Sequence, residues 1–232
     1  MTESRVGAGF SIVDIPPPAE YVSLLGAVAD KTGLLAVPLT FTGVAVTTDE
    51  SIFVGVAQNA FPGQIASMSV TDNLGNIYTL QSFLKPGLCT AAVFAANPSV
   101  AGTISTITVN QPAGAPIGIV AGRFRYVGAS VASTQETSSG PNYGSGPNAV
   151  LTQAGPTNGI GISCYGVRTT GSISFGPGTL VGYASTSGGA DSSNIDMGLG
   201  YVLPVTASGI TGLLFGDPTR AWVHAGKSYD AA

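Results

Sequence analysis

Charged side chains are scarce in this chain. Asp, Glu, Lys and Arg together make up 9% of its 232 residues, against about 25% in an ordinary globular domain. Only eight residues are basic and the formal net charge is −4, so nucleic acid is not expected as a direct partner. Because hydrophobic residues reach 44%, the low charge favours a surface that other chains partly cover over a monomer with a Ser/Thr/Gly surface.

Long apolar runs and cysteine clusters are also missing. No run of about 18 apolar residues occurs, so no membrane-spanning helix is expected. The first 18 residues lack an apolar core of signal-peptide length. Cys89 and Cys164 lie in apolar, strand-like runs, which favours two buried thiols over a disulfide. No further ligands stand near them for a metal pair, and no cofactor is expected.

The residues that are present favour β-strands. Around residues 64–80, Met68 and Val70 alternate with polar side chains, the turn-forming segment 72–76 follows, and Ile77–Leu80 returns as β-formers. This pattern predicts a β-hairpin. Similar runs recur every eight to twelve residues, which is typical of a sandwich. We therefore expect an all-β fold, a two-sheet antiparallel β-sandwich of jelly-roll type. Its core should contain Val54, Val56, Met68, Val70, Phe94, Ile107, Val109, Phe124 and Ile162.

Two later segments depart from the strand pattern. Residues 128–158 are rich in Ser, Gly, Pro and Asn and predict a long surface loop in which Val150 and Leu151 pair briefly. Residues 220–223 suggest a last short strand followed by a polar tail. No convincing internal repeat is visible in the sequence.

The N-terminus predicts a docking arm at residues 1–33, ahead of a sandwich domain at residues 34–232. Pro16-Pro17-Pro18 favours stiff, extended backbone. Residues 19–31 fit a short helix, because their large apolar side chains would share one face. Packing of this segment on its own domain is the alternative. The side chains expected to contact a partner are Phe10, Ile12, Val13, Ile15, Tyr21, Leu24 and Leu25.

Part of the sequence resembles a known family. The residues that carry the resemblance are Val70, Thr71, Asp72, Gly75, Asn76, Tyr78, Thr79, Phe94, Ala95 and Asn97. Over residues 35–130 the chain resembles β-sandwich domains of bacteriophage virion proteins and related bacterial surface proteins. The resemblance implies a jelly-roll or immunoglobulin-like sandwich that serves as a head decoration, fibre or tail appendage. It brings no catalytic residues.

Candidate chemistry is sparse. His224 is the only histidine, and no nucleophile stands on a shaped turn to complete a triad with it. The acidic residues give no focus for paired-carboxylate chemistry. Residues 191–196 offer oxygen ligands at short spacing but lack the EF-hand pattern, so a solvated loop is the simpler interpretation. Sugar-stacking aromatics would require a shared face; the candidates are Tyr143, Tyr165, Tyr183 and Tyr201.

These observations predict a non-enzymatic structural protein of a bacteriophage particle, a capsid decoration or head-fibre subunit anchored through its N-terminal arm. Its partners would be the capsid or neighbouring subunits, with a homo-oligomer such as a trimer, and its location the virion, assembled in the host cytoplasm. The alternative is a carbohydrate- or receptor-binding module of a tail fibre or cell-surface protein. Its loops at 128–158 and 186–194 would then hold a host glycan.

Overall fold

Antiparallel strands make up most of the structure, a computed structural model. It describes residues 17–59, 67–84, 89–97, 99–112, 114–139, 148–153, 158–168, 173–175, 178–186, 194–203, 209–215 and 222–232. No α-helix occurs in these ranges, and none of the described segments forms a helix that could span a membrane. The all-β antiparallel sandwich predicted from the sequence is therefore confirmed.

The strands fall into two successive groups of eight. The first group is β1 (Glu20–Asp30), β2 (Ala36–Val46), β3 (Glu50–Gln58), β4 (Ser69–Asp72), β5 (Thr79–Leu84), β6 (Thr90–Ala96), β7 (Gly102–Asn110) and β8 (Ile117–Arg125). The second group is β9 (Val127–Ser139), β10 (Asn148–Gln153), β11 (Ile160–Val167), β12 (Ile173–Phe175), β13 (Thr179–Ser185), β14 (Asp196–Val202), β15 (Gly209–Phe215) and β16 (Trp222–Ala231).

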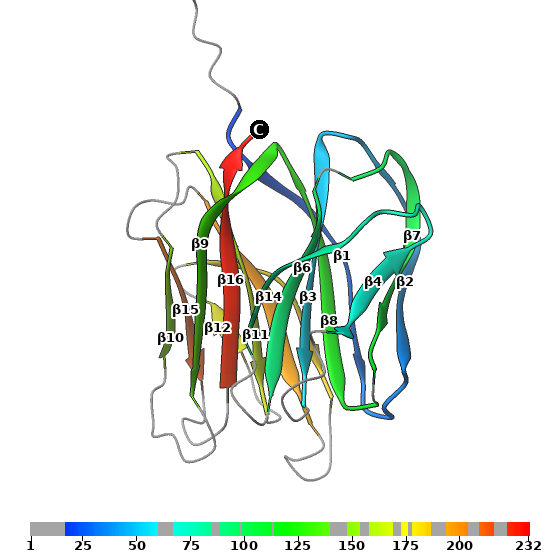
Figure 1. Ribbon diagram of the computed structural model, residues 1–232, viewed down its shortest axis with the longest axis vertical. Helices are drawn as coiled ribbons and strands as arrows, with labels where there is room; N and C mark the ends of the chain where they lie inside the picture. Colours follow the sequence, from blue (N-terminus) through cyan, green and yellow to red (C-terminus); the bar gives the residue numbers. More distant parts are fainter. Residues whose placement is uncertain are drawn as a thin grey trace, which may run out of the picture.

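Each group forms its own two-sheet sandwich. In the first sandwich an inner sheet β1-β8-β3-β6-β5 lies against an outer sheet β2-β7-β4. In the second, an inner sheet β9-β16-β11-β14-β13 accompanies an outer sheet β10-β15-β12. Strands 1, 8, 3 and 6 in one sheet and 2, 7 and 4 in the other give the nested pairing of a jelly roll. Figure 1 shows the four sheets side by side, from β10-β15-β12 at the left to β2-β7-β4 at the right.

The two sandwiches repeat one topology, because each strand of the second occupies the place of the strand eight positions earlier. The irregularities repeat as well. A register shift follows Leu80 where β5 pairs with β6, and an equivalent shift follows Leu180 where β13 pairs with β14. Each of these leucines follows a threonine and is 37% exposed. The repeat that the sequence conceals is therefore present in the strand pairing.

The inner sheets pack face to face and build the core that joins the sandwiches. Phe53, Val120 and Phe124 of the first sandwich pack with Ile162 and Leu199 of the second. A separate core lies between the two sheets of the first sandwich. All nine side chains predicted for the core are buried. They are Val54, Val56, Met68, Val70, Phe94, Ile107, Val109, Phe124 and Ile162.

Glycines let the inner sheets approach closely. A Cβ on Gly118 would lie 2.4 Å from Met197 Cγ of the opposite sheet, and a Cβ on Gly166 would lie 2.6 Å from Ala57 Cβ. Real Cβ atoms keep larger separations in close-packed interiors. The glycine-rich composition therefore has a structural cause at these positions, which is backbone approach across the joint.

The predicted helix at residues 19–31 is wrong. Residues 20–30 form β1, which pairs with β8 at the edge of the inner sheet. Register shifts after Tyr21 and after Leu24 break the two-residue alternation. Bulged strands place large side chains at uneven spacing, which imitates the three- and four-residue spacing of a helix. The segment is part of the sheet, so the alternative of packing on its own domain holds for these residues.

The predicted hairpin at residues 64–80 is also wrong, because β4 and β5 belong to different sheets. β4 pairs with β7 in the outer sheet and β5 pairs with β6 in the inner sheet. Asp72 organises the crossing: its carboxylate accepts bonds from the backbone nitrogens of Leu74 and Asn76 at 2.9 and 3.1 Å. The Tyr78 hydroxyl donates to the same carboxylate at 2.8 Å. The predicted turn chemistry is thus present, but it joins two sheets instead of two neighbouring strands.

The predicted loop at residues 128–158 is replaced in part by strands. β9 covers residues 127–139 and pairs with β16, and β10 pairs with β15, which confirms the brief pairing expected at Val150 and Leu151. The polar tail also proves to be a strand, since β16 runs to Ala231 between β11 and β9. Threonine and valine favour strands even in segments where glycine and serine dominate. The overall composition of these segments therefore predicted a loop and a tail where strands form.

Candidate functional site

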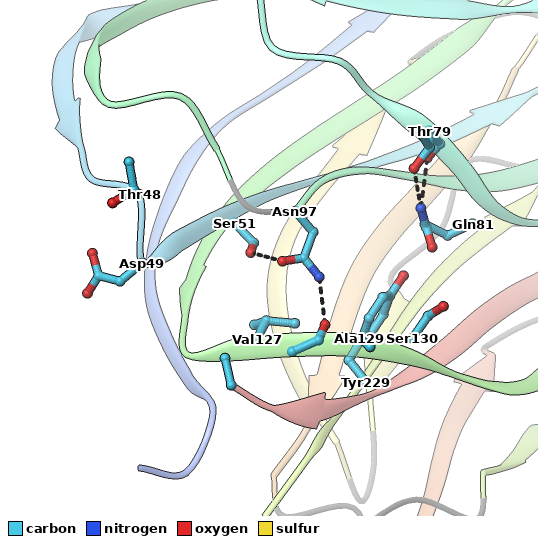
Figure 2. A pocket seen from close by; sticks show the side chains of 12 residues that line it. Thr48, Asp49, Ser51, Thr79, Gln81, Asn97, Val127, Ala129, Ser130 and Tyr229 are labelled. Carbon is cyan, nitrogen blue, oxygen red and sulfur yellow. Dashed lines mark hydrogen bonds between the residues drawn. The ribbon is translucent and has the colours of Figure 1, made fainter. Parts of the chain in front are cut away.

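A pocket of about 490 Å³ lies at one end of the joint between the two sandwiches. The first sandwich contributes the turn before β3, the edge strand β5 and Asn97 after β6. The second sandwich contributes the start of β9, Tyr229 of β16 and Ala232. Figure 2 shows these side chains around the open space. Its size falls in the range of small-molecule sites, about 300–1,000 Å³.

Asn97 links the two sandwiches at the pocket wall. The Ser51 hydroxyl donates to Asn97 Oδ1 at 2.6 Å, and Asn97 Nδ2 donates to the backbone oxygen of Gly128 at 2.8 Å (Figure 2). Gln81 Nε2 donates to the hydroxyl of Thr79 on the neighbouring wall. These bonds fix the orientation of neutral donors and acceptors around the pocket.

Tyr126 is the single residue that connects β8 to β9, next to the lining residue Val127. Its φ of 56° lies in the left-handed region, which non-glycine residues seldom adopt. Its backbone nitrogen donates to the oxygen of Asp49 at 3.1 Å, and its oxygen accepts from the nitrogen of Ala232 at 2.9 Å. The linker thus ties the first sandwich to the C-terminal strand.

An ion-pair cluster lies beside the pocket. Arg125 pairs across neighbouring strands with Glu20 at 3.3 Å and Glu50 at 2.7 Å, and with Asp49 at 3.2 Å. Glu50 is only 2% exposed, and Arg123 reaches it at 3.4 Å. A hydrogen bond from Thr47 lowers the pKa of Asp49, and Arg125 adds to that effect. The Glu50 hydrogen bond raises the pKa of Arg125.

We expect Arg125→Ala to lower the free energy of unfolding at least about twice as much as Glu20→Gln does. The arginine variant leaves the buried Glu50 with its longer contact to Arg123 and a 3.3 Å hydrogen bond from the backbone nitrogen of Thr47. Glu20→Gln is the matched control, because it removes a half-exposed partner of the same arginine. Urea unfolding of both variants measures how much free energy of unfolding each one loses. Equal losses would contradict the view that Arg125 stabilises the protein mainly through the buried Glu50.

The residues predicted to bind a partner separate into three kinds. Phe10, Ile12, Val13 and Ile15 lie outside the described residues. Leu25 is 6% exposed and packs in the core of the first sandwich. Tyr21 stacks on Tyr201 with ring centroids 5.0 Å apart. Leu24 is 43% exposed, so of the three described side chains it alone offers much of its surface to solvent.

The sole histidine lies inside the second sandwich. His224 is fully buried beside Tyr165, with ring centroids 6.0 Å apart. Neither of its ring nitrogens has a hydrogen-bond partner within the part of the chain that the structure describes. Burial lowers its pKa to about 3. The imidazole is therefore neutral and out of contact with solvent.

The other sequence candidates gain no chemistry from the structure. Among the described residues, no group of three His, Cys, Asp or Glu side chains could hold a metal ion. Asp196 is buried and accepts a bond from the Ser185 hydroxyl, whereas residues 187–193 lie outside the described ranges. Cys89 and Cys164 are free and buried, as predicted, and burial raises the pKa of each thiol to about 12.

The tyrosines proposed for sugar stacking do not gather on one face. Tyr165 faces away from the joint, beside His224, whereas Tyr201 packs against the joint core. Tyr143 lies outside the described residues. The pocket instead uses Tyr229, which the sequence placed in a polar tail. Its wall comes from segments far apart in the chain, so no local sequence signal marks the site.

Protein-family models, curated proteins and solved structures were all compared with the chain. None of them matches it.

Proposed function

We propose that the chain is a non-enzymatic structural subunit of a bacteriophage particle, a capsid decoration or head-fibre protein. The observation that carries the proposal is the tandem jelly roll, two eight-stranded sandwiches joined face to face. Jelly rolls recur in viral capsid and lectin domains. The motifs at residues 70–79 and 94–97 point to the same class. The protein would reside in the virion, after assembly in the host cytoplasm.

The surface supports association with other chains. Several large apolar side chains are exposed on strands and turns: Leu24, Leu34, Leu35, Ile77, Leu80, Val100 and Leu180. Charge, which normally keeps protein surfaces apart, is confined to 9% of the residues. A neutral surface with apolar side chains suits burial against capsid proteins or further copies of the chain, in a homo-oligomer such as a trimer.

The burial of the histidine and the two thiols supports a non-enzymatic role. His224, Cys89 and Cys164 are enclosed by packed strands, so a substrate in solvent cannot reach them. Acid–base and nucleophilic catalysis both require contact between such groups and the reacting atoms. These three side chains serve the cores of the protein.

Attachment to the particle is assigned to residues 1–16, which carry Phe10, Ile12, Val13 and Ile15. The structure changes how this must be tested. A shortened chain that starts at Leu34 would lose β1 and uncover β8, so its failure would report misfolding. The informative truncation starts at Pro17, because β1 and its partners are then complete.

We expect the protein that lacks residues 1–16 to keep its melting temperature within about 2 °C but to lose particle decoration, because the truncation leaves every described strand complete. Several apolar side chains buried on a partner, in contrast, contribute about 1.5–3 kcal/mol each. Electron microscopy of labelled particles measures occupancy. Full occupancy by the truncated chain would contradict attachment through this segment.

A second candidate function is glycan or receptor binding, the alternative drawn from the sequence. The observation that favours it is the pocket between the sandwiches, with its hydroxyl and amide side chains (Figure 2), rather than the loops at 128–158 and 186–194. The two functions are compatible in one virion protein.

A further inference from the structure

The pocket holds a buried polar group that the fold does not use. Tyr229 is 1% exposed, and its hydroxyl has no hydrogen-bond partner among the described residues. The ring is fixed by an edge contact with Phe53 at 5.0 Å between centroids. In Figure 2 the hydroxyl end points into the pocket, on the side of Gln81. A buried hydroxyl without a partner costs free energy, which a ligand that bonds to it would recover.

The other polar groups around this hydroxyl are mostly neutral. Hydroxyls come from Thr48, Ser51, Thr79 and Ser130, and amides from Gln81 and Asn97. These side chains offer both donors and acceptors. Val127 and Ala129 add apolar surface on the β9 side. The wall therefore matches a ligand that carries hydroxyl groups on a compact carbon frame.

The charges at the pocket further restrict the class of ligand that it can bind. Among the described residues of its wall there is no Lys or Arg, and the one charged side chain is the carboxylate of Asp49. Arg125 binds Asp49 Oδ2 at 3.2 Å but is not one of the lining residues of the pocket. The described wall offers an anionic ligand a carboxylate and no basic side chain to bind it. Hydroxyl donors, in contrast, bond well to a carboxylate.

We propose that this pocket binds a neutral saccharide of one or two sugar units, which gives the second candidate function a site and a ligand class. The Tyr229 hydroxyl and the Gln81 amide bond to sugar hydroxyls in the interior, and Asp49 accepts from a sugar hydroxyl at the rim. Because both sandwiches form the wall, the site exists only in the assembled tandem. The inference does not depend on particle attachment, since residues 1–16 contribute nothing to the described pocket wall.

The test is calorimetric titration of the full chain with glucose, galactose, mannose, N-acetylglucosamine, lactose and maltose. At least one of these should bind saturably. Tyr229→Phe should weaken that sugar about three- to tenfold, the loss of one hydrogen bond. It should leave the melting temperature unchanged or slightly higher, because no protein partner is lost. Tyr165→Phe is the matched control, a buried tyrosine on the opposite face of the inner sheet, and should bind as the wild type does.

A second variant tests the same site in case the Tyr229→Phe change weakens sugar binding only slightly. Thr48→Trp places a large ring at the exposed rim and should abolish binding while the fold is kept. Absence of binding by the whole panel would overturn the proposal, as would unchanged binding in both variants. Sialic acid is titrated as the anionic comparison, and tighter binding of it than of every neutral sugar would also overturn the proposal. Particle decoration by the Tyr229→Phe protein should stay at wild-type occupancy, which separates this test from that of attachment.

Discussion

Gly166→Ala is expected to lower the free energy of unfolding by about 3 kcal/mol, a large effect for a single methyl group. The new Cβ would lie 2.6 Å from Ala57 Cβ across the joint. An alanine Cβ is fixed to its backbone, so no rotamer change relieves the overlap. The two inner sheets would have to separate, which disturbs a core packed at native density.

The exchange of the two residues provides the control. Ala57→Gly removes the opposing methyl and should cost about 1 kcal/mol, through lost burial and a more flexible strand. The double variant places one methyl group in the same space and should return to within about 1 kcal/mol of the wild type, since the two sites are in contact and couple. Urea unfolding of all four proteins gives the coupling energy. Simple addition of the two losses would contradict close contact at this point.

When the pH falls from 6.5 to 4.5, the titration of His224 is expected to reduce the free energy of unfolding by about 2–3 kcal/mol. Burial lowers the pKa of this imidazole to about 3 in the folded state, whereas an unfolded histidine titrates near 6.5. Below pH 6.5 the unfolded chain therefore binds a proton that the folded chain does not. Stability falls as pH decreases, by about 1.4 kcal/mol per unit, and the decline ends near the folded pKa.

The measurement compares wild type with His224→Leu by urea unfolding at several pH values from neutral to mildly acidic. His224 is the only histidine, so the leucine variant should lose most of the slope in this window. It should also gain stability at neutral pH, because a buried imidazole without hydrogen bonds is replaced by an apolar side chain. Parallel curves for the two proteins would show that the imidazole is solvated.

The structural repeat of the two sandwiches explains why an apolar side chain was chosen to replace His224. When the register shifts after Leu80 and Leu180 are aligned, the strand pairings place His224 at the position of Ile119 and Tyr165 at that of Val56. Ile119 and Val56 are buried in the core of the first sandwich. The second sandwich has thus exchanged an apolar cross-strand pair for a polar one.

The sequence predicted the structure correctly where a single local signal determines it. Alternation of apolar and polar residues marks the buried face of a strand, and it located Val54, Val70, Ile107 and the other core residues correctly. Turn chemistry located the Asp72 segment. Both signals are local, so they can be recognised without knowing which strand is the partner.

Partner choice, in contrast, is not local. Nothing within residues 64–80 distinguishes a hairpin from a crossing between sheets, because both need the same turn residues. The repeat was hidden because its halves share strand pairing and not side-chain identity, as Val56 and Tyr165 illustrate. The pocket was hidden for a similar reason, since Tyr229 and Asn97 meet only when the sandwiches pack.

The nested order of the strands has a kinetic consequence. β1 pairs with β8, so the inner sheet of the first sandwich cannot close until Arg125 has been made. Most contacts therefore join distant parts of the chain, which makes folding slow compared with that of helical proteins. During synthesis the first sandwich would be complete while its joint face, with Phe53 and Phe124, still awaits the second half. A nascent chain with such an exposed face is prone to aggregate until the remainder has been made.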